Sequence, residues 1–460
     1  MATQPPANVL LIHCHDLGRF LGCYGVETVH TPVLDALAAD GITFTDAFCT
    51  APQCSPSRAA LFTGRYPHST GVMGLTHKGW DLHDSERHLA QLLRDGGYRT
   101  DLIGIHHESL RCPDDQIAAQ LGFDHVDTLG ATHYERRAEL VADRSVAVLA
   151  DRARHPDQPF YLQAGFLEPH RLQNPEPGRD AMGFTGGYIE PDRSRGVTIP
   201  GYLANDDGTQ QEIAELQGAV TYTDAAIGRI LTELDRTGLA ERTIVIFTTD
   251  HGLALPAAKC TLRDPGLETA LIMRAPSLGW TGGRTVDGLV SNVDIAPTLL
   301  EAVGLPTPGN VHGRSIGAAL AGESWQPREE VFAELTFHDY YDPQRCVRTD
   351  RHKLIVHFDR CNPHTGAATQ SWRPRSTPVT ERLAATPTMV ELYDLDEDPL
   401  ELTNLATDPH HTDLVDQLRR TLLGWMEMTD DPLLHSAVSS PAQHSAQHFV
   451  TTGQPAIHHS

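Results

Sequence analysis

Segments typical of buried strands alternate with helix-like segments along the first two thirds of the chain. The apolar run Asn8–Ile12 and the β-branched run Thr243–Thr248 are typical of central strands in a sheet. Further strands are predicted at 98–103 and 160–164, and helices at 32–41, 87–95, 135–152, 210–236 and 294–303. This order predicts an α/β fold, in which a mostly parallel sheet is covered by helices on both faces.

The pattern changes after about residue 330. Short strands are predicted at 331–335, 353–357 and 390–395, followed by a last helix at 411–428. We therefore expect three regions: an α/β domain over 1–330, a smaller α+β subdomain over 331–436, and a polar tail over 437–460. The tail has little apolar content, so we expect it to be disordered or laid as an arm on a neighbouring subunit of a homo-oligomer.

The formal net charge of −24 argues against a nucleic-acid partner. A protein that binds nucleic acid usually carries a basic face, and the composition of this chain predicts no such face. Eight cysteines lack paired spacing, which argues against a disulfide framework or a zinc ribbon. No apolar run approaches the roughly 18 residues of a membrane helix, and the first residues do not resemble a secretory signal. We expect a cytoplasmic protein whose anion sites are built from local cations.

The most informative string is Cys54-Ser55-Pro56-Ser57-Arg58, followed by Leu61 and Thr63-Gly64-Arg65. A helix is expected to begin near Ser57. The plain interpretation is a buried cysteine in a loop that precedes this helix. However, the whole string resembles the signature of the sulfatase family, in which C/S-x-P-S-R leads into a short helix that ends in T-G-R.

The resemblance implies a specific chemistry at Cys54. In sulfatases a separate formylglycine-generating enzyme oxidises this cysteine to formylglycine, whose hydrated form is a geminal diol. One hydroxyl, bound to a metal ion, attacks sulfur, and the other then expels sulfate. Arg58 would place a fixed cation beside the nucleophile, and the helix N-terminus would face the anion.

Further strings follow the order seen in sulfatases. The resemblance implies metal ligands at His15, Asp16, Asp250 and His251, together with the group derived from Cys54. It also implies that Lys259 and His170 contact the sulfuryl group, that His170 protonates the leaving group, and that His107 helps release sulfate. His106 is an alternative to His107 in a locally altered motif. Arg171 is expected either to touch the substrate or to form a surface salt bridge.

Simpler interpretations exist for the same residues. Asp16 and Asp250 would otherwise be turn or cap carboxylates, and His15 and His251 packed or outer-sphere histidines. Lys259 would be a solvated lysine and His170 part of a Pro-His turn. His13 shares a strand face with His15, and for it a core histidine is the favoured interpretation. No role is assigned to His68 or His77.

Two positions depart from the family pattern. His15 stands where sulfatases carry an acidic ligand, and Ile105 stands where they carry a lysine. Family members hold calcium or magnesium, but calcium prefers oxygen ligands. His15 and His251 together favour Mn²⁺, Fe²⁺ or Zn²⁺. Phosphonate monoester hydrolases of the same superfamily also lack that lysine and carry Asp-His at the second ligand pair.

The resemblance predicts an alkaline-phosphatase-like α/β fold with a C-terminal α+β subdomain. The expected activity is metal-dependent hydrolysis of a small-molecule or sugar sulfate, or of a sulfamate. The strings Pro169-His170-Arg171 and 404–409 are closest to the heparan N-sulfatase branch. A phosphonate monoester or phosphodiester hydrolase, and a degenerate member that only binds anions, stay open as alternatives. Neither a nucleic acid nor a membrane is an expected partner.

Overall fold

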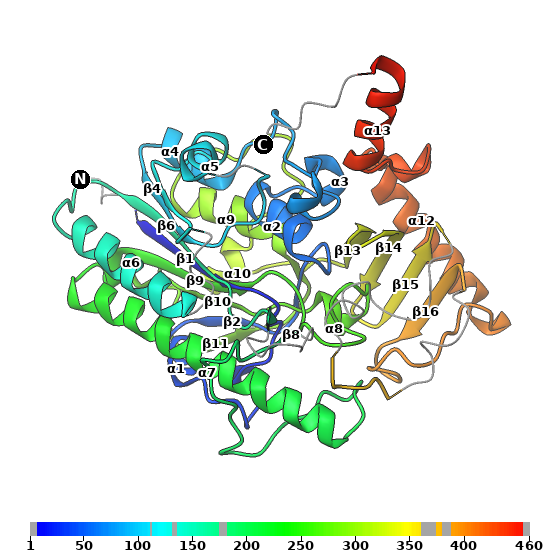
Figure 1. Ribbon diagram of the computed structural model, residues 1–460, viewed down its shortest axis with the longest axis horizontal. Helices are drawn as coiled ribbons and strands as arrows, with labels where there is room; N and C mark the ends of the chain where they lie inside the picture. Colours follow the sequence, from blue (N-terminus) through cyan, green and yellow to red (C-terminus); the bar gives the residue numbers. More distant parts are fainter. Residues whose placement is uncertain are drawn as a thin grey trace.

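A computed structural model describes residues 7–110, 113–130, 136–173, 182–359, 374–379 and 388–453. Its main sheet has eight strands in the order β11-β2-β10-β9-β1-β6-β4-β5 (Figure 1). The bounds are β1 Asn8–Cys14, β2 Ile42–Phe44, β4 Arg99–Gly104, β5 His125–Asp127, β6 Phe160–Phe166, β9 Thr243–Thr249, β10 Leu271–Arg274 and β11 Arg284–Val286. Only β10 runs antiparallel to both of its neighbours. The predicted mostly parallel sheet is therefore confirmed.

Alternate residues of β1 enter two separate cores, which is why its central residues 9–12 are all apolar. Leu10 and Ile12 pack toward α1 (Pro32–Asp40), α6 (Arg137–Arg152) and α7 (Asp207–Arg236). Val9 and Leu11 face the opposite layer. That layer contains α2 (Cys54–Thr63), α4 (Leu89–Asp95), α5 (Asp114–Leu121) and α9 (Ile295–Ala302). Helices thus cover both faces of the sheet (Figure 1), as the uniform burial of β1 requires.

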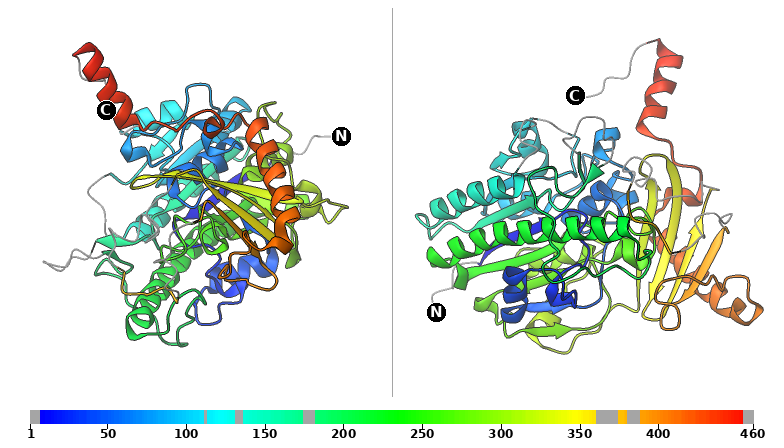
Figure 2. Two further views of the ribbon diagram at one scale, coloured as in Figure 1. Left: turned by 90° about the vertical axis from the view of Figure 1, so that its right-hand side faces the viewer. Right: turned by 60° about the horizontal axis from the view of Figure 1, so that its bottom comes forward.

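A separate four-stranded antiparallel sheet follows in the C-terminal part of the chain (Figure 2). Its strands are β13 Glu330–Phe337, β14 Tyr341–Thr349, β15 His352–His357 and β16 Val390–Asp394. One face packs on α12 (Thr412–Met428), and the other on residues of the α/β region such as Cys49 and Leu262. Because Cys49 belongs to this contact, the sheet lies directly against the segment that leads to Cys54. The sequence did not predict β14, because residues 341–349 mix polar and apolar side chains.

The tail differs from the expectation of a disordered segment. Residues Pro441–Thr452 form helix α13, which projects from the body of the molecule (Figures 1 and 2). The Ser440 side chain accepts a hydrogen bond from the Gln443 amide, Pro441 occupies the first turn, and Gly453 closes the helix in the left-handed region. These are ordinary helix start and stop signals, which low apolar content obscured.

Four adjacent parallel strands, β9, β1, β6 and β4, end at one edge of the main sheet. Cys14 is paired with Thr249 on one side and with Phe166 on the other, so the residues after these strands come together. This edge is where α/β sheets bind their ligands. Among the described residues, no helix is long and apolar enough to cross a bilayer.

A buried group of charges joins the C-terminal sheet to the α/β region. Lys353 on β15 is fully buried, and its Nζ lies 2.5 Å from Asp264 Oδ1 and 2.9 Å from Glu401 Oε1. Arg348 on β14 also contacts the Asp264 carboxylate, at 3.0 Å. Because these charges are removed from water, each depends on its partners.

We expect Lys353→Met to lower the free energy of unfolding by about 3–5 kcal/mol, since it leaves two buried carboxylates with less compensating charge. Urea unfolding followed by circular dichroism measures the change. Arg351→Met is the matched control, because the Arg351 side chain is 52% exposed where it pairs with Asp394. It should cost no more than about 1 kcal/mol. Equal effects of the two substitutions would contradict a special role for the buried group.

Candidate active site

Helix α2 begins at Cys54 itself, three residues earlier than the sequence predicted. Gln53 is its extended N-cap residue, and Gly64 ends it in the left-handed region. Residues three and four apart share a helix face, so Cys54, Ser57 and Arg58 point to the same side. The Ser57 hydroxyl donates to the Asp250 carbonyl oxygen, and Arg58 Nε lies 3.2 Å from Asp250 Oδ2. The spacing of the signature therefore attaches the helix to the end of β9.

The Asp250 carboxylate joins the ends of β1 and β9. Asp250 Oδ1 accepts hydrogen bonds from the amides of Asp16 (3.0 Å) and His251 (2.9 Å). Asp16 has a positive φ of 54°, which turns its backbone sharply at the end of β1. Both side chains are buried, and nearby cations hold the pKa of each well below its usual range although burial opposes this. Both are therefore carboxylates rather than neutral acids.

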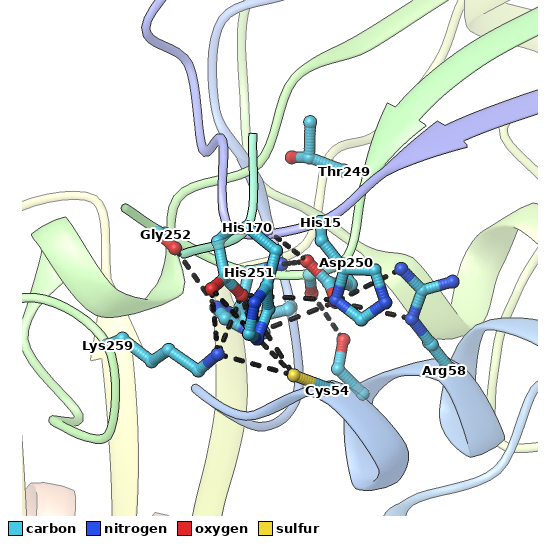
Figure 3. Close-up of polar contacts among 12 residues, drawn as sticks. His15, Cys54, Arg58, His170, Thr249, Asp250, His251, Gly252 and Lys259 are labelled. Atoms are coloured by element: carbon cyan, nitrogen blue, oxygen red, sulfur yellow. Dashed lines mark hydrogen bonds and ion pairs between the residues drawn. The ribbon is translucent and has the colours of Figure 1, made fainter. Parts of the chain in front are cut away.

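Cys54 lies next to the ammonium group of Lys259 (Figure 3). Its Sγ lies 3.3 Å from Lys259 Nζ, which also donates to both Asp16 oxygens at 2.7 and 2.9 Å. Burial acts to raise the pKa of Cys54, but Lys259 and His15, with a hydrogen bond to His107, bring it well below the ordinary value. A negative charge at this position is stabilised, as a nucleophile or a bound anion requires.

The histidines predicted as ligands direct ring nitrogens toward the carboxylates. His15 Nδ1 lies 3.0 Å from Asp250 Oδ2, and His251 Nε2 lies 3.1 Å from Asp16 Oδ1. His251 Nδ1 lies 3.0 Å from the Gly252 carbonyl oxygen, a contact that makes Nδ1 the protonated nitrogen of the neutral ring. Its Nε2 lone pair is then directed into the site.

These residues fit a metal ion. One ligand atom from each of His15, Asp16, Cys54 and Asp250 lies within 4.8 Å of the others. Within the described parts of the chain, neither buried nitrogen of His15 forms a hydrogen bond of good geometry. A buried imidazole without such partners is costly unless a cation or proton satisfies it. In a protein without metal, Asp250 and Asp16 outweigh burial and raise the pKa of His251 to about 10.

Two further histidines, His170 and His107, border this group of residues. His170 Nε2 lies 3.6 Å from Asp16 Oδ2, and its Nδ1 lies 2.7 Å from the Arg171 carbonyl oxygen. Burial lowers the pKa of His170 and, to about 4, that of His107. His107 interacts with Cys54, whereas the strongest charge contact of His106 is with Glu108. Of the two adjacent histidines, the geometry favours His107 at the nucleophile.

Arg171 differs from one of its predicted positions, whereas His13 is the core histidine that was expected. Arg171 is fully buried, and its guanidinium donates to Glu212 at 2.7 Å and to the Ala254 carbonyl oxygen at 2.7 Å. The surface salt bridge considered for it is therefore a buried ion pair. Its substrate contact stays a prediction. His13 is buried behind Arg58, with its Nδ1 2.6 Å from Arg58 Nη1, so it holds the cation and does not face the site.

The sequence did not indicate a group of residues next to His107, which we call the mouth of the site: His77, Lys78, His338 and Asp339. His77 and Lys78 lie in a short 3₁₀ turn, Thr76–Lys78, where the His77 ring stacks on His107 at 5.8 Å. His338 and Asp339 come from the turn between β13 and β14, and Lys78 Nζ lies 2.7 Å from Asp339 Oδ1. No local signal joins residues 260 positions apart; the β13–β14 hairpin alone could have suggested the turn.

A second buried group, His68, Glu334 and Asp431, also has metal-like spacing. Arg345 lies among these side chains, with Nη2 3.1 Å from Asp431 Oδ1 and Nε 3.6 Å from Glu334 Oε2. A guanidinium already supplies the cation there, so this group holds the C-terminal sheet in place and gives His68 a structural role.

Comparisons with known proteins show which family this sequence matches. A family model described as Sulfatase matches residues 7–305, and one described as N-sulphoglucosamine sulphohydrolase, C-terminal, matches residues 257–371. Human N-sulphoglucosamine sulphohydrolase is 29% identical across 93% of this chain and 91% of that protein. An ulvan-active sulfatase of Formosa agariphila is 27% identical across 91% of this chain and 80% of its own length.

Solved structures show the same fold. One, in complex with its substrate D-glucosamine-2-N,6-O-disulfate, superposes with a TM-score of 0.71 at 20% identity. It covers 94% of this chain and all of that one. The phosphonate monoester hydrolase of Agrobacterium radiobacter has a TM-score of 0.68 at 21% identity and covers 92% of this chain and 96% of that one. The predicted alkaline-phosphatase-like architecture is confirmed at the level of the fold.

Proposed function

This chain belongs to the sulfatase family of hydrolases, and we propose that it hydrolyses a sulfate ester or sulfamate through a nucleophile derived from Cys54. The observation that carries the proposal is the position of Cys54. It is the first residue of a buried helix, with Sγ 3.3 Å from Lys259 Nζ and 3.5 Å from His251 Nε2. A tetrahedral anion bound here would meet fixed cations, although the chain as a whole is acidic.

The proposed roles follow from the placement of protons. In the overall reaction the bond from sulfur to the leaving oxygen or nitrogen breaks, water supplies the new sulfate oxygen, and the leaving atom gains a proton. His170 gives that proton from Nε2 in its doubly protonated form, because the Arg171 carbonyl oxygen holds the Nδ1 proton. Asp16 Oδ2, 3.6 Å from Nε2, favours this charged form against burial. Formylglycine, made from Cys54 by a formylglycine-generating enzyme, supplies a diol in which one hydroxyl attacks and the other drives release of sulfate. His107, neutral near pH 7, accepts a proton beside it.

We further propose that His15, Asp16, Asp250 and His251 hold one divalent cation. Such an ion supplies Lewis-acid polarisation of the sulfuryl oxygens and of the nucleophile. The family favours calcium or magnesium, but two imidazole nitrogens beside two carboxylates form a donor set that prefers Mn²⁺, Fe²⁺ or Zn²⁺. His251 is prepared for this role because the Gly252 carbonyl oxygen fixes its tautomer.

An assay across paired substrates tests the proposed function. We expect kcat/KM for sulfate esters to exceed that for the matching phosphonate monoesters by at least about tenfold, because an enzyme distinguishes substrates by how tightly it binds their transition states. Purified protein that contains formylglycine and is loaded with metal is assayed on 4-nitrophenyl sulfate, 4-nitrophenyl phenylphosphonate and a panel of monosulfated sugars. The opposite ratio across the panel would reject the sulfatase assignment.

The phosphonate alternative rests on two features of the sequence. Ile105 removes a cation that sulfatases carry, and Asp250-His251 matches the pair seen in phosphonate monoester hydrolases. A degenerate, anion-binding member is a third possibility. It requires an unmodified Cys54, and mass spectrometry of the Cys54 peptide from the native host therefore decides against it or for it.

A further inference from the structure

The reacting groups are buried, but the mouth above them is exposed and polar. Cys54, Asp16 and Lys259 are almost inaccessible to solvent, whereas the His170 side chain is 23% exposed. Across the mouth, Lys78 and Asp339 are 35% and 30% exposed. His107 interacts with Cys54, His77 stacks on His107, and Lys78 follows His77 in the chain. The leaving group of a substrate bound at Cys54 can therefore extend toward Lys78 and Asp339.

Three hydrogen bonds between residues far apart in the sequence hold the end of β13 and the turn after it against Gln53 and Lys78. Gln53, the residue before Cys54, donates its side-chain amide to the Phe337 carbonyl oxygen at 3.3 Å. Lys78 Nζ donates to the His338 carbonyl oxygen at 2.9 Å and to Asp339 Oδ1 at 2.7 Å. The turn is therefore fixed at the mouth, and the Asp339 side chain is oriented before any substrate arrives.

The Asp339 carboxylate suits a leaving group that carries hydrogen-bond donors. Its Oδ1 is bound by Lys78, while Oδ2 lies 3.5 Å from His338 Nδ1. A carboxylate accepts about four hydrogen bonds in total, so it keeps capacity for donors on a ligand. A leaving group with hydroxyl or amine donors can use this capacity.

We propose that Asp339, held by Lys78, is a specificity-determining residue that accepts a hydrogen bond from a hydroxyl or amine of the leaving group. This inference rests on the proposed sulfatase function and assigns its substrate class: a monosulfated sugar. An aryl sulfate offers no such donor. A second sulfate group next to Asp339 would be repelled by its carboxylate, because the charge of Lys78 is already neutralised by Asp339. A substrate with a single sulfate group is therefore favoured.

The test compares Asp339→Asn with the wild-type enzyme on two substrates. We expect kcat/KM for the best monosulfated sugar of the panel to fall about 10- to 100-fold, because a donor on the leaving group loses its charged acceptor. On 4-nitrophenyl sulfate the change should stay within about threefold. Asp396→Asn is the matched control, since that carboxyl is 63% exposed and outside the mouth.

A charge swap, Lys78→Asp with Asp339→Lys, separates recognition from simple attachment of the turn. The swap keeps an ion pair between the same two segments, so thermal stability should be retained. We expect sugar sulfate activity to stay low while aryl sulfate activity remains. Recovery of sugar sulfate activity in the swap, or an equal loss on both substrates in Asp339→Asn, would overturn the inference. Absence of wild-type activity on every sulfate would instead reject the proposed function.

Discussion

Replacement of Cys54 by alanine should reduce kcat/KM on 4-nitrophenyl sulfate by at least about 10⁴-fold, because loss of a covalent nucleophile removes the chemical step itself. The fold should survive. Cys54 is the first residue of α2, and alanine suits that helix. The helix stays attached to β9 through Ser57 and Arg58, which contact Asp250. Steady-state kinetics with urea unfolding on the same preparations separates the two properties.

Cys346→Ala is the control for this substitution. Cys346 is equally buried, but it lies on β14 in the C-terminal sheet and contacts none of the site residues described above. It should retain near wild-type kcat/KM. Mass spectrometry of the wild-type Cys54 peptide completes the experiment, since the proposed nucleophile requires an aldehyde in place of the thiol. More than about a tenth of wild-type activity in Cys54→Ala would show that another group attacks the ester.

The half of the site that holds the nucleophile could be predicted because its contacts are local or follow from strand order. Cys54 and Arg58 lie four residues apart on one helix, and Asp16 and Asp250 each follow a predicted parallel strand. Ends of neighbouring parallel strands meet at one edge of a sheet, so the sequence implied their proximity. In the structure, Asp250 accepts hydrogen bonds from the Asp16 backbone amide and from Arg58 Nε, and Cys54 Sγ lies 3.9 Å from Asp16 Oδ1.

The mouth of the site could not be predicted in the same way. Asp339 reaches Lys78 only because the C-terminal sheet packs one apolar face on Cys49 and Leu262, and tertiary packing of this kind leaves no local pattern. Arg171 shows the opposite failure. Arg171 follows His170 in the motif, and His170 lies at the site. The Arg171 side chain, however, donates a hydrogen bond to Glu212 on α7. A motif fixes the position of a residue along the chain and leaves the direction of its side chain open.

The two departures from the family pattern act on the same charge balance. Asp16 and Asp250 supply two negative charges, and Arg58 and Lys259 supply two positive ones at contact distance. A neutral His15 in place of a carboxylate makes the metal-binding side less negative by one charge, and Ile105 in place of a lysine removes one positive charge. The two changes cancel in formal charge, so the charge balance is compatible with the proposed dication and a sulfate group bound together. What changes is the chemistry of the ligand atoms.

Substitution of His15 by aspartate should therefore change which metal the protein holds. Wild-type protein should bind Mn²⁺ or Zn²⁺ about 100-fold more tightly than Ca²⁺, since imidazole nitrogen favours these ions and calcium prefers oxygen. In His15→Asp that ratio should fall toward one, because a carboxylate replaces the imidazole whose Nδ1 lies 3.0 Å from Asp250 Oδ2 and so supplies oxygen ligands in place of nitrogen. The readouts are metal content after chelator treatment and reloading, and the shift in thermal midpoint with each ion.

Stability and metal content report binding even in a preparation that lacks formylglycine. An ion present at about 100 times its Kd stabilises the folded state by about 2.7 kcal/mol, which a thermal midpoint resolves. His444→Asp on the exposed helix α13 is the control and should leave the preference unchanged. If wild-type protein retains calcium as well as manganese, and His15→Asp changes neither, His15 is not a ligand. Its two buried nitrogens would then need a proton-based explanation, in which His15 pairs with Asp250 as an imidazolium.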